Sequence, residues 1–211
     1  MASMPTATPS AGPSAGAVSG PSTQYAIKRS FWGGHLDIMA ADTGQRIFHV
    51  NMISFAVRKP SMIVHSGSST LGPVVAACKF KSFSADIDVG LGDLAQPSSM
   101  KWERLTHAGT FSPRWTFRVA VGGRHPQSFT WKKTHSMGTG SSGNWKLVNE
   151  QTQSVLAVFT LANGITRRAC ELNIYSHDYG EQFNFMVVLT GTAMYVGMQR
   201  GGGGGGGGGG A

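Results

Sequence analysis

Short runs in which apolar and polar residues alternate recur along the chain, with turn residues between them. Strict alternation over about four to eight residues predicts half-buried β-strands. The breaks fall at Asp42-Thr43-Gly44, Lys59-Pro60, Leu71-Gly72-Pro73 and Asn163-Gly164, and the last of these is a strong hairpin signal. The predicted strands are residues 25–31, 35–39, 46–50, 53–57, 61–65, 74–80, 84–89, 101–106, 114–121, 127–132, 145–149, 155–161 and 166–175.

The segment 181–200, EQFNFMVVLTGTAMYVGMQR, does not alternate and is apolar over most of its length. A helix that is apolar on every side must be buried. Because a bilayer span takes roughly 20 apolar residues and this run is shorter, enclosure by protein is favoured over membrane insertion. Two alternatives stay open at this point: a helix inserted in a membrane, and two strands separated near residues 190–192.

Many strands followed by one buried helix predict a mainly β fold. A closed sheet has no exposed edges, and a wide one needs a filling for its interior. The sequence therefore predicts a closed antiparallel β-barrel of about twelve strands around a central, C-terminal hydrophobic α-helix.

Three segments and their order also resemble a known group of proteins. They are the strand–turn–strand of residues 36–50, the pair of runs at residues 145–150 and 155–159, and the terminal apolar helix. Together they are similar to the tubby C-terminal-like superfamily, which includes tubby domains, phospholipid scramblases and LURP-one-related proteins. The resemblance extends over residues 25–200. It implies a twelve-stranded barrel around a hydrophobic helix and, from tubby domains, phosphoinositide binding through surface Lys and Arg.

Composition divides the chain into one domain and two tails. Residues 1–23 contain only small and polar residues besides two methionines, a valine and prolines, without charge, and residues 201–211 are ten glycines and an alanine. Such segments cannot bury enough apolar surface to fold. We therefore expect a disordered tail at 1–23, a folded domain at 24–200 and a flexible tail at 201–211. The start has no secretory-signal pattern, and Cys78 and Cys170 lie in apolar runs, which favours free thiols and a cytoplasmic location, either free or peripheral at a membrane.

The chain is basic but sparsely charged. It has 18 Lys and Arg against 10 Asp and Glu, a net charge of +8, although charged residues are only 13% of the total. A basic excess favours anionic partners such as lipid headgroups, nucleic acid or acidic proteins.

Most of that excess lies between residues 101 and 133. If the strands at 114–121 and 127–132 form a hairpin, alternation places Arg114, Arg118 and Lys132 on one outward face. Arg and Lys suit phosphate oxygens. The predicted lipid-phosphate site comprises Arg114, Arg118, Arg124, Lys132 and Lys133.

Other chemistries have weaker signals. Trp115, Phe117, Phe129 and Trp131 fall on the inward phase, which disfavours base stacking with nucleic acid. The seven histidines are scattered, without metal-ligand spacing to cysteine, so we predict no metal site and no cofactor. No nucleophile, base and orienting group converge in the sequence, so we predict no enzyme.

The sequence thus predicts a noncatalytic, monomeric module that binds anionic phospholipid headgroups, phosphoinositides among them. The alternative is an interaction scaffold for a protein partner with no lipid role. A third possibility is a scramblase-like lipid translocator, although the chain lacks the cysteine cluster associated with scramblases.

Overall fold

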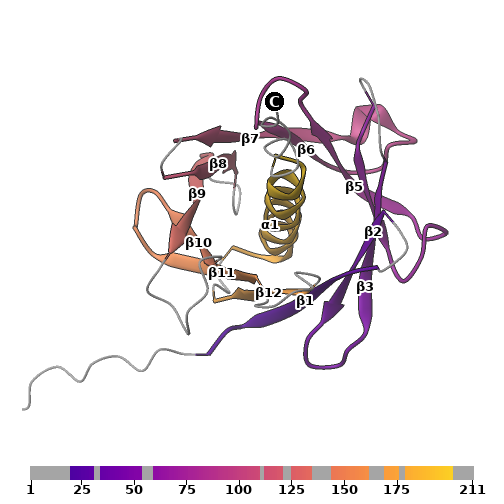
Figure 1. Cartoon of the computed structure of the whole chain (residues 1–211), viewed down its shortest axis with the longest axis horizontal. Coiled ribbons are helices and arrows are strands. Elements are labelled where there is room, and N and C mark those ends of the chain that lie inside the picture. Colours follow the sequence, from indigo (N-terminus) through magenta and orange to yellow (C-terminus); the bar gives the residue numbers. More distant parts are fainter. Residues whose placement is uncertain are drawn as a thin grey trace, which may run out of the picture.

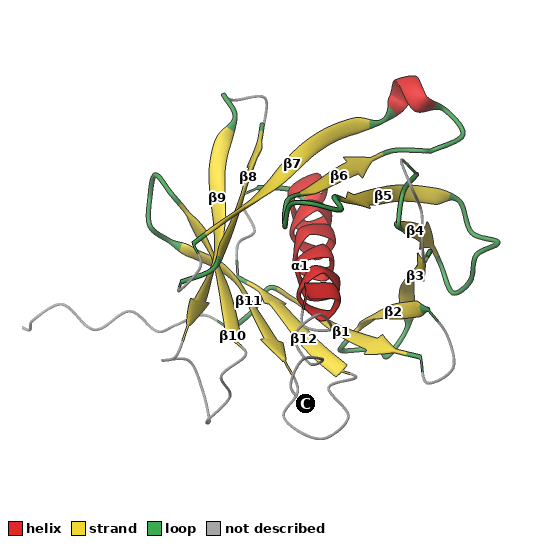
Figure 2. Cartoon of the chain, turned by 45° about the horizontal axis from the view of Figure 1, so that its top comes forward, coloured by secondary structure: helices red, strands yellow, loops and turns green. Residues whose placement is uncertain are grey.

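The computed structural model of the chain describes residues 20–30, 34–53, 59–109, 112–120, 125–134, 144–161, 169–175 and 179–201. These residues form a closed barrel of twelve antiparallel strands and one long helix, α1 (Glu181–Gly201), inside it (Figures 1 and 2). A short 3-10 helix, η1 (Pro97–Ser99), precedes β7. The strands are β1 (Thr23–Arg29), β2 (His35–Ala40), β3 (Arg46–Met52), β4 (Met62–Ser66), β5 (Val74–Phe80), β6 (Ile87–Leu91), β7 (Lys101–Ala108), β8 (Arg114–Val119), β9 (Gln127–Thr134), β10 (Asn144–Asn149), β11 (Val155–Leu161) and β12 (Ala169–Ile174).

Every strand pairs with its neighbours in the sequence, and β1 pairs with β12 to close the barrel. In that last ladder Thr23 lies opposite Ile174 and Lys28 lies opposite Ala169. Full closure leaves no unpaired strand edge. The predicted barrel is confirmed.

The two ends of the barrel are distinguished by the direction of α1. Phe183, in its first turn, contacts the ring of Phe129 at 4.8 Å, near the start of β9. Arg200, in its last turn, lies over the ring of Phe80 at 4.4 Å, where β5 ends. We refer to these as the Glu181 end and the Arg200 end.

The helix is apolar all round because strands surround it on all sides. Val187, Val188, Leu189 and Thr190 follow one another around the helix, and none is more than 1% exposed. The Trp131 indole N–H donates a hydrogen bond of 3.1 Å to the Thr190 hydroxyl. One continuous helix replaces the alternative of two strands. In the part of the chain that the structure describes, no helix is long and apolar enough to cross a membrane.

Gly191 marks a close approach of the helix to the wall. A Cβ atom there would lie 3.2 Å from Phe159 and 3.4 Å from Trp131, tighter than an ordinary van der Waals contact. The glycine that interrupts the apolar run therefore lets the helix pass two large aromatic side chains.

The strand predictions coincide with the barrel strands, with ends displaced by a few residues. The turn at residues 42–44 is confirmed, and Gly44 adopts the left-handed φ of 67° that favours glycine. Ile53, the first residue of the predicted strand at 53–57, does not belong to a strand, and the rest of that prediction and the Asn163-Gly164 turn lie outside the described residues.

Candidate functional site

Three cationic side chains stand in one row across β8, β9 and β10. The strand register places Arg114 opposite Lys132, and Lys132 opposite Lys146. Neighbouring strands lie about 4.8 Å apart, so the row spans about 10 Å. We call the outer surface of these three strands the basic face.

The inward phase of the same strands explains why the cations point outward. Trp115, Phe117, Phe129 and Trp131 are all at most 5% exposed and belong to the core around α1. Alternation then sends the intervening residues to the outside. The strand register thus contains the predicted hairpin of β8 and β9. Its aromatic residues lie inside the barrel, and Arg114, Arg118 and Lys132 lie outside.

Hydroxyl groups fill the space between the cations. Thr116 and Thr130 lie opposite each other, and their hydroxyl oxygens are 2.8 Å apart. Beyond them Arg118 lies opposite Ser128. Thr130 is only 2% exposed and its hydroxyl already bonds to that of Thr116, so the charged side chains are the main donors that this face offers to a phosphate group.

One carboxylate borders this surface. Glu150 Oε1 lies 3.0 Å from Lys132 Nζ. The hydrogen bond from Lys132, a second from Thr130 and the charge of Arg114 hold the pKa of Glu150 below its usual range. Among the described residues, Lys132 is consequently paired with an acid, while its two neighbours in the row are not.

Within the described residues, Arg114, Arg118 and Lys146 form no ion pair. Arg118 acts at longer range on Glu103. Burial raises the pKa of Glu103, and the positive charge of Arg118 partly counteracts that rise.

Two cations on other strands of the wall do have partners. Arg104 on β7 donates to Asp88 at 3.0 Å, and Lys79 on β5 lies 4.0 Å from the centre of the Trp102 ring.

The five predicted site residues do not all join this face. Lys133 follows Lys132 and so has the opposite phase; it lies in register with Trp145, whose side chain is buried. Arg124 lies outside the described residues. Lys146 was missed, because nothing in the sequence indicated that β10 pairs with β9.

Two large apolar side chains are fully exposed at turns on opposite ends of the barrel. Phe83 lies in the turn between β5 and β6, and Leu71 in the turn between β4 and β5; their exposures are 103% and 95%. β6 pairs with β7 from Ile87 onward, and Ala108 at the finish of β7 lies opposite Arg114. The Phe83 turn and the row that begins with Arg114 therefore share the Arg200 end.

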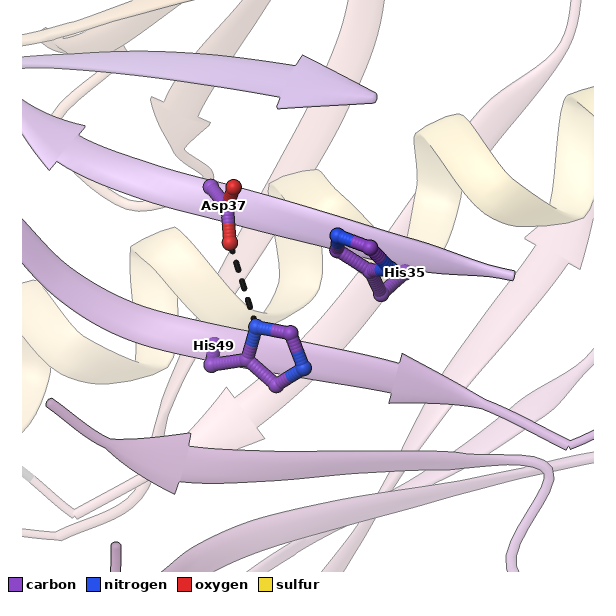
Figure 3. Close-up of side chains that lie close together, drawn as sticks. All are labelled: His35, Asp37 and His49. Carbon is purple, nitrogen blue, oxygen red and sulfur yellow. Dashed lines mark hydrogen bonds and ion pairs between the residues drawn. The ribbon is translucent and has the colours of Figure 1, made fainter. Parts of the chain in front are cut away.

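A second group of polar side chains lies on the outer surface of β2 and β3. Asp37 lies opposite His49, and His35 precedes Asp37 by two residues on the same strand, so the three share one side (Figure 3). Asp37 Oδ1 and His49 Nδ1 are 3.1 Å apart. Asp37 Oδ2 is 3.1 Å from Arg46, which completes the network.

The histidine group was not predicted, although the sequence contains part of its signal. Leu36, Ile38 and Val50 are apolar and buried, so alternation alone places His35, Asp37 and His49 outside. Which residues stand opposite one another depends on a β-bulge between Ile38 and Met39, which the sequence does not mark.

Comparison with protein-family models, with curated proteins and with solved structures finds no match to this chain.

Proposed function

We propose that the chain is a noncatalytic, peripheral membrane-binding module whose basic face binds the phosphate groups of anionic lipid headgroups. The observation that carries this proposal is the in-register row Arg114, Lys132 and Lys146, with Arg118 on the same surface. Three of these four cations have no ion-pair partner among the described residues. The resemblance to tubby domains supports the same class of ligand.

The charge count gives the size of the effect. Four cations and the single carboxylate of Glu150 leave a local charge of +3, obtained as 4 − 1. Near an anionic leaflet each basic residue contributes about 1 kcal/mol, so the face contributes about 3 kcal/mol. That corresponds to roughly a 150-fold preference for anionic over neutral membranes, enough for reversible binding.

Phe83 supports a particular orientation on the membrane. It is a fully exposed aromatic side chain at the Arg200 end, the end at which Arg114 begins β8. Transfer of a Phe side chain from water to an apolar phase is favourable, by up to about 2 kcal/mol when burial is complete. In this proposal the Arg200 end faces the bilayer, with Phe83 at the interface.

The first test is co-sedimentation of the full chain with phosphatidylcholine vesicles, with and without phosphoinositide, at low and physiological salt. The double variant Arg114→Glu/Lys146→Glu should reduce binding by at least about 30-fold, since two contributions of about 1 kcal/mol are lost. Lys101→Glu is the matched control: it reverses one exposed lysine at the Glu181 end and should change binding by less than about threefold.

A second pair of variants tests the orientation. Phe83→Ala should weaken binding, whereas Leu71→Ala, at the opposite end, should not. Equal sedimentation with neutral and anionic vesicles would contradict the proposal, provided that near-ultraviolet circular dichroism shows a folded protein. A scaffold for a protein partner would then be the better account.

A further inference from the structure

The histidine group on β2 and β3 has the composition of a metal site. His35, Asp37 and His49 each offer one ligand-type atom, and these atoms lie within 4.8 Å of one another. Figure 3 shows the three side chains on the same side of the two strands. His49 is buried, with 9% of its surface exposed, and the other two residues are half-buried. The group therefore lies on two hydrogen-bonded strands of the barrel wall.

Two of the atoms already have the separation that a shared metal ion imposes. Zinc bonds to histidine nitrogen and carboxylate oxygen are about 2.0–2.2 Å long, so two ligands at a tetrahedral angle lie roughly 3.3 Å apart. The distance from Asp37 Oδ1 to His49 Nδ1 is 3.1 Å. A metal ion at this position would replace the proton that the two atoms now share. Only the half-exposed His35 ring has to move closer.

We propose that His35, Asp37 and His49 bind one divalent transition-metal ion, of which Zn²⁺ is the representative. Two imidazoles and one carboxylate suit zinc and its neighbours, whereas Mg²⁺ and Ca²⁺ prefer oxygen ligands. Three protein ligands leave a position for water. This inference is independent of lipid binding, because the site lies on different strands from the basic face.

Arg46 holds the carboxylate of Asp37 in place without itself being a metal ligand. It lies 3.1 Å from Asp37 Oδ2, which orients the carboxylate and leaves Oδ1 directed at His49. Partners of this kind hold metal ligands in place. The Arg46 charge, with Lys28 opposite Asp37 on β1, also lowers the affinity for a dication. The ion must therefore be one that bonds strongly to neutral imidazole.

A purely structural network would explain some of these contacts but not the position of His35. Asp37 can serve simply to fix His49 and Arg46 by hydrogen bonds. The His35 imidazole makes no hydrogen bond with the described residues; the centre of its ring lies 4.9 Å from that of the His49 ring. A network of hydrogen bonds does not need His35, whereas a metal site does. His35 therefore discriminates between the two explanations.

The test is equilibrium dialysis of the full chain with Zn²⁺, followed by metal analysis, and titration with Co²⁺ followed by its visible absorption spectrum. Each of His35→Ala, Asp37→Asn and His49→Gln should lower the affinity for the strongest-bound ion by at least about tenfold. His125→Ala removes an exposed histidine elsewhere and should leave that affinity unchanged. Zn²⁺ should also raise the melting temperature of the wild-type protein but not that of His35→Ala.

His35→Ala keeps the test decisive even if the partly buried positions affect folding. The expected result is an unchanged melting temperature without metal and a lost response to Zn²⁺. The proposal is overturned if His35→Ala binds as tightly as the wild-type protein, or if His125→Ala weakens binding equally. Absence of stoichiometric Zn²⁺ in the wild-type protein after dialysis would overturn it as well.

Discussion

The hydrogen bond between Trp131 and Thr190 joins the barrel wall to the central helix, and Thr190→Val removes it with little change in volume. The Trp131 side chain is fully buried, so its N–H would be left without an acceptor. An unsatisfied buried donor costs about 1–3 kcal/mol. We therefore expect Thr190→Val to lower the free energy of unfolding by that amount.

Thr192→Val supplies a matched control in the same helix. Thr192 is equally buried, and its hydroxyl donates to the Val188 carbonyl at 2.8 Å, as that of Thr190 does to Met186. Only Thr190 also accepts from an indole. Valine and threonine have similar helix propensities, so Thr192→Val should cost less than about 0.5 kcal/mol.

Urea denaturation followed by far-ultraviolet circular dichroism measures the free energy of unfolding of both variants, since a single domain with one core is expected to unfold cooperatively. Trp131→Phe completes a double-mutant cycle, because in that background the donor is absent and Thr190→Val should cost little. Equal costs for the two threonine variants, or a Thr190→Val cost that persists in Trp131→Phe, would refute the reasoning.

Three further outcomes follow from burial and charge. Leu189→Asp should abolish cooperative unfolding, because an unpaired charge would enter the core where Leu189 is 1% exposed; a folded variant by near-ultraviolet circular dichroism would contradict the central helix. Burial raises the pKa of Cys170 to about 12 and that of Cys78 well above its usual range, so at pH 8 neither thiol should react with a disulfide reagent until urea unfolds the chain. The pKa of Glu150 is lowered, chiefly by the hydrogen bond from Lys132, so Glu150 stabilises the fold above the usual glutamate pKa of 4.5. That stabilisation is lost as the pH falls through the lowered pKa. Glu150→Gln should remove this step from a plot of stability against pH and, because it removes one negative charge, strengthen vesicle binding about fivefold at neutral pH.

The fold was predictable because its two main signals are local. Alternation over short runs is set by burial of one strand face, and it marks the barrel strands without knowledge of their partners. The run from Phe183 to Val196 is apolar on every side, which indicates a buried helix, and its length favours enclosure by protein over a membrane span. The break at residues 190–192 left the two-strand alternative open, because the glycine at position 191 is explained by contacts with Phe159 and Trp131 that exist only in the folded state.

The candidate sites were predictable only where they depend on one strand or one tight hairpin. Arg114, Arg118 and Lys132 could be grouped because alternation and the β8–β9 hairpin were both visible in the sequence. Lys146 and His49 depend on register between strands. Register follows from turn geometry and bulges, and a shift by one residue moves a side chain to the other face.

Because α1 follows all twelve strands in the sequence, its position determines when the barrel can acquire its core. The residues that fill the interior, from Phe183 to Val196, are synthesised after all twelve strands. The closing ladder also joins residues far apart in sequence, since Thr23 pairs with Ile174. Domains with such distant contacts fold slowly, and unpaired strands that wait for their core are prone to aggregate. We therefore expect the strands to acquire their core only once α1 has left the ribosome.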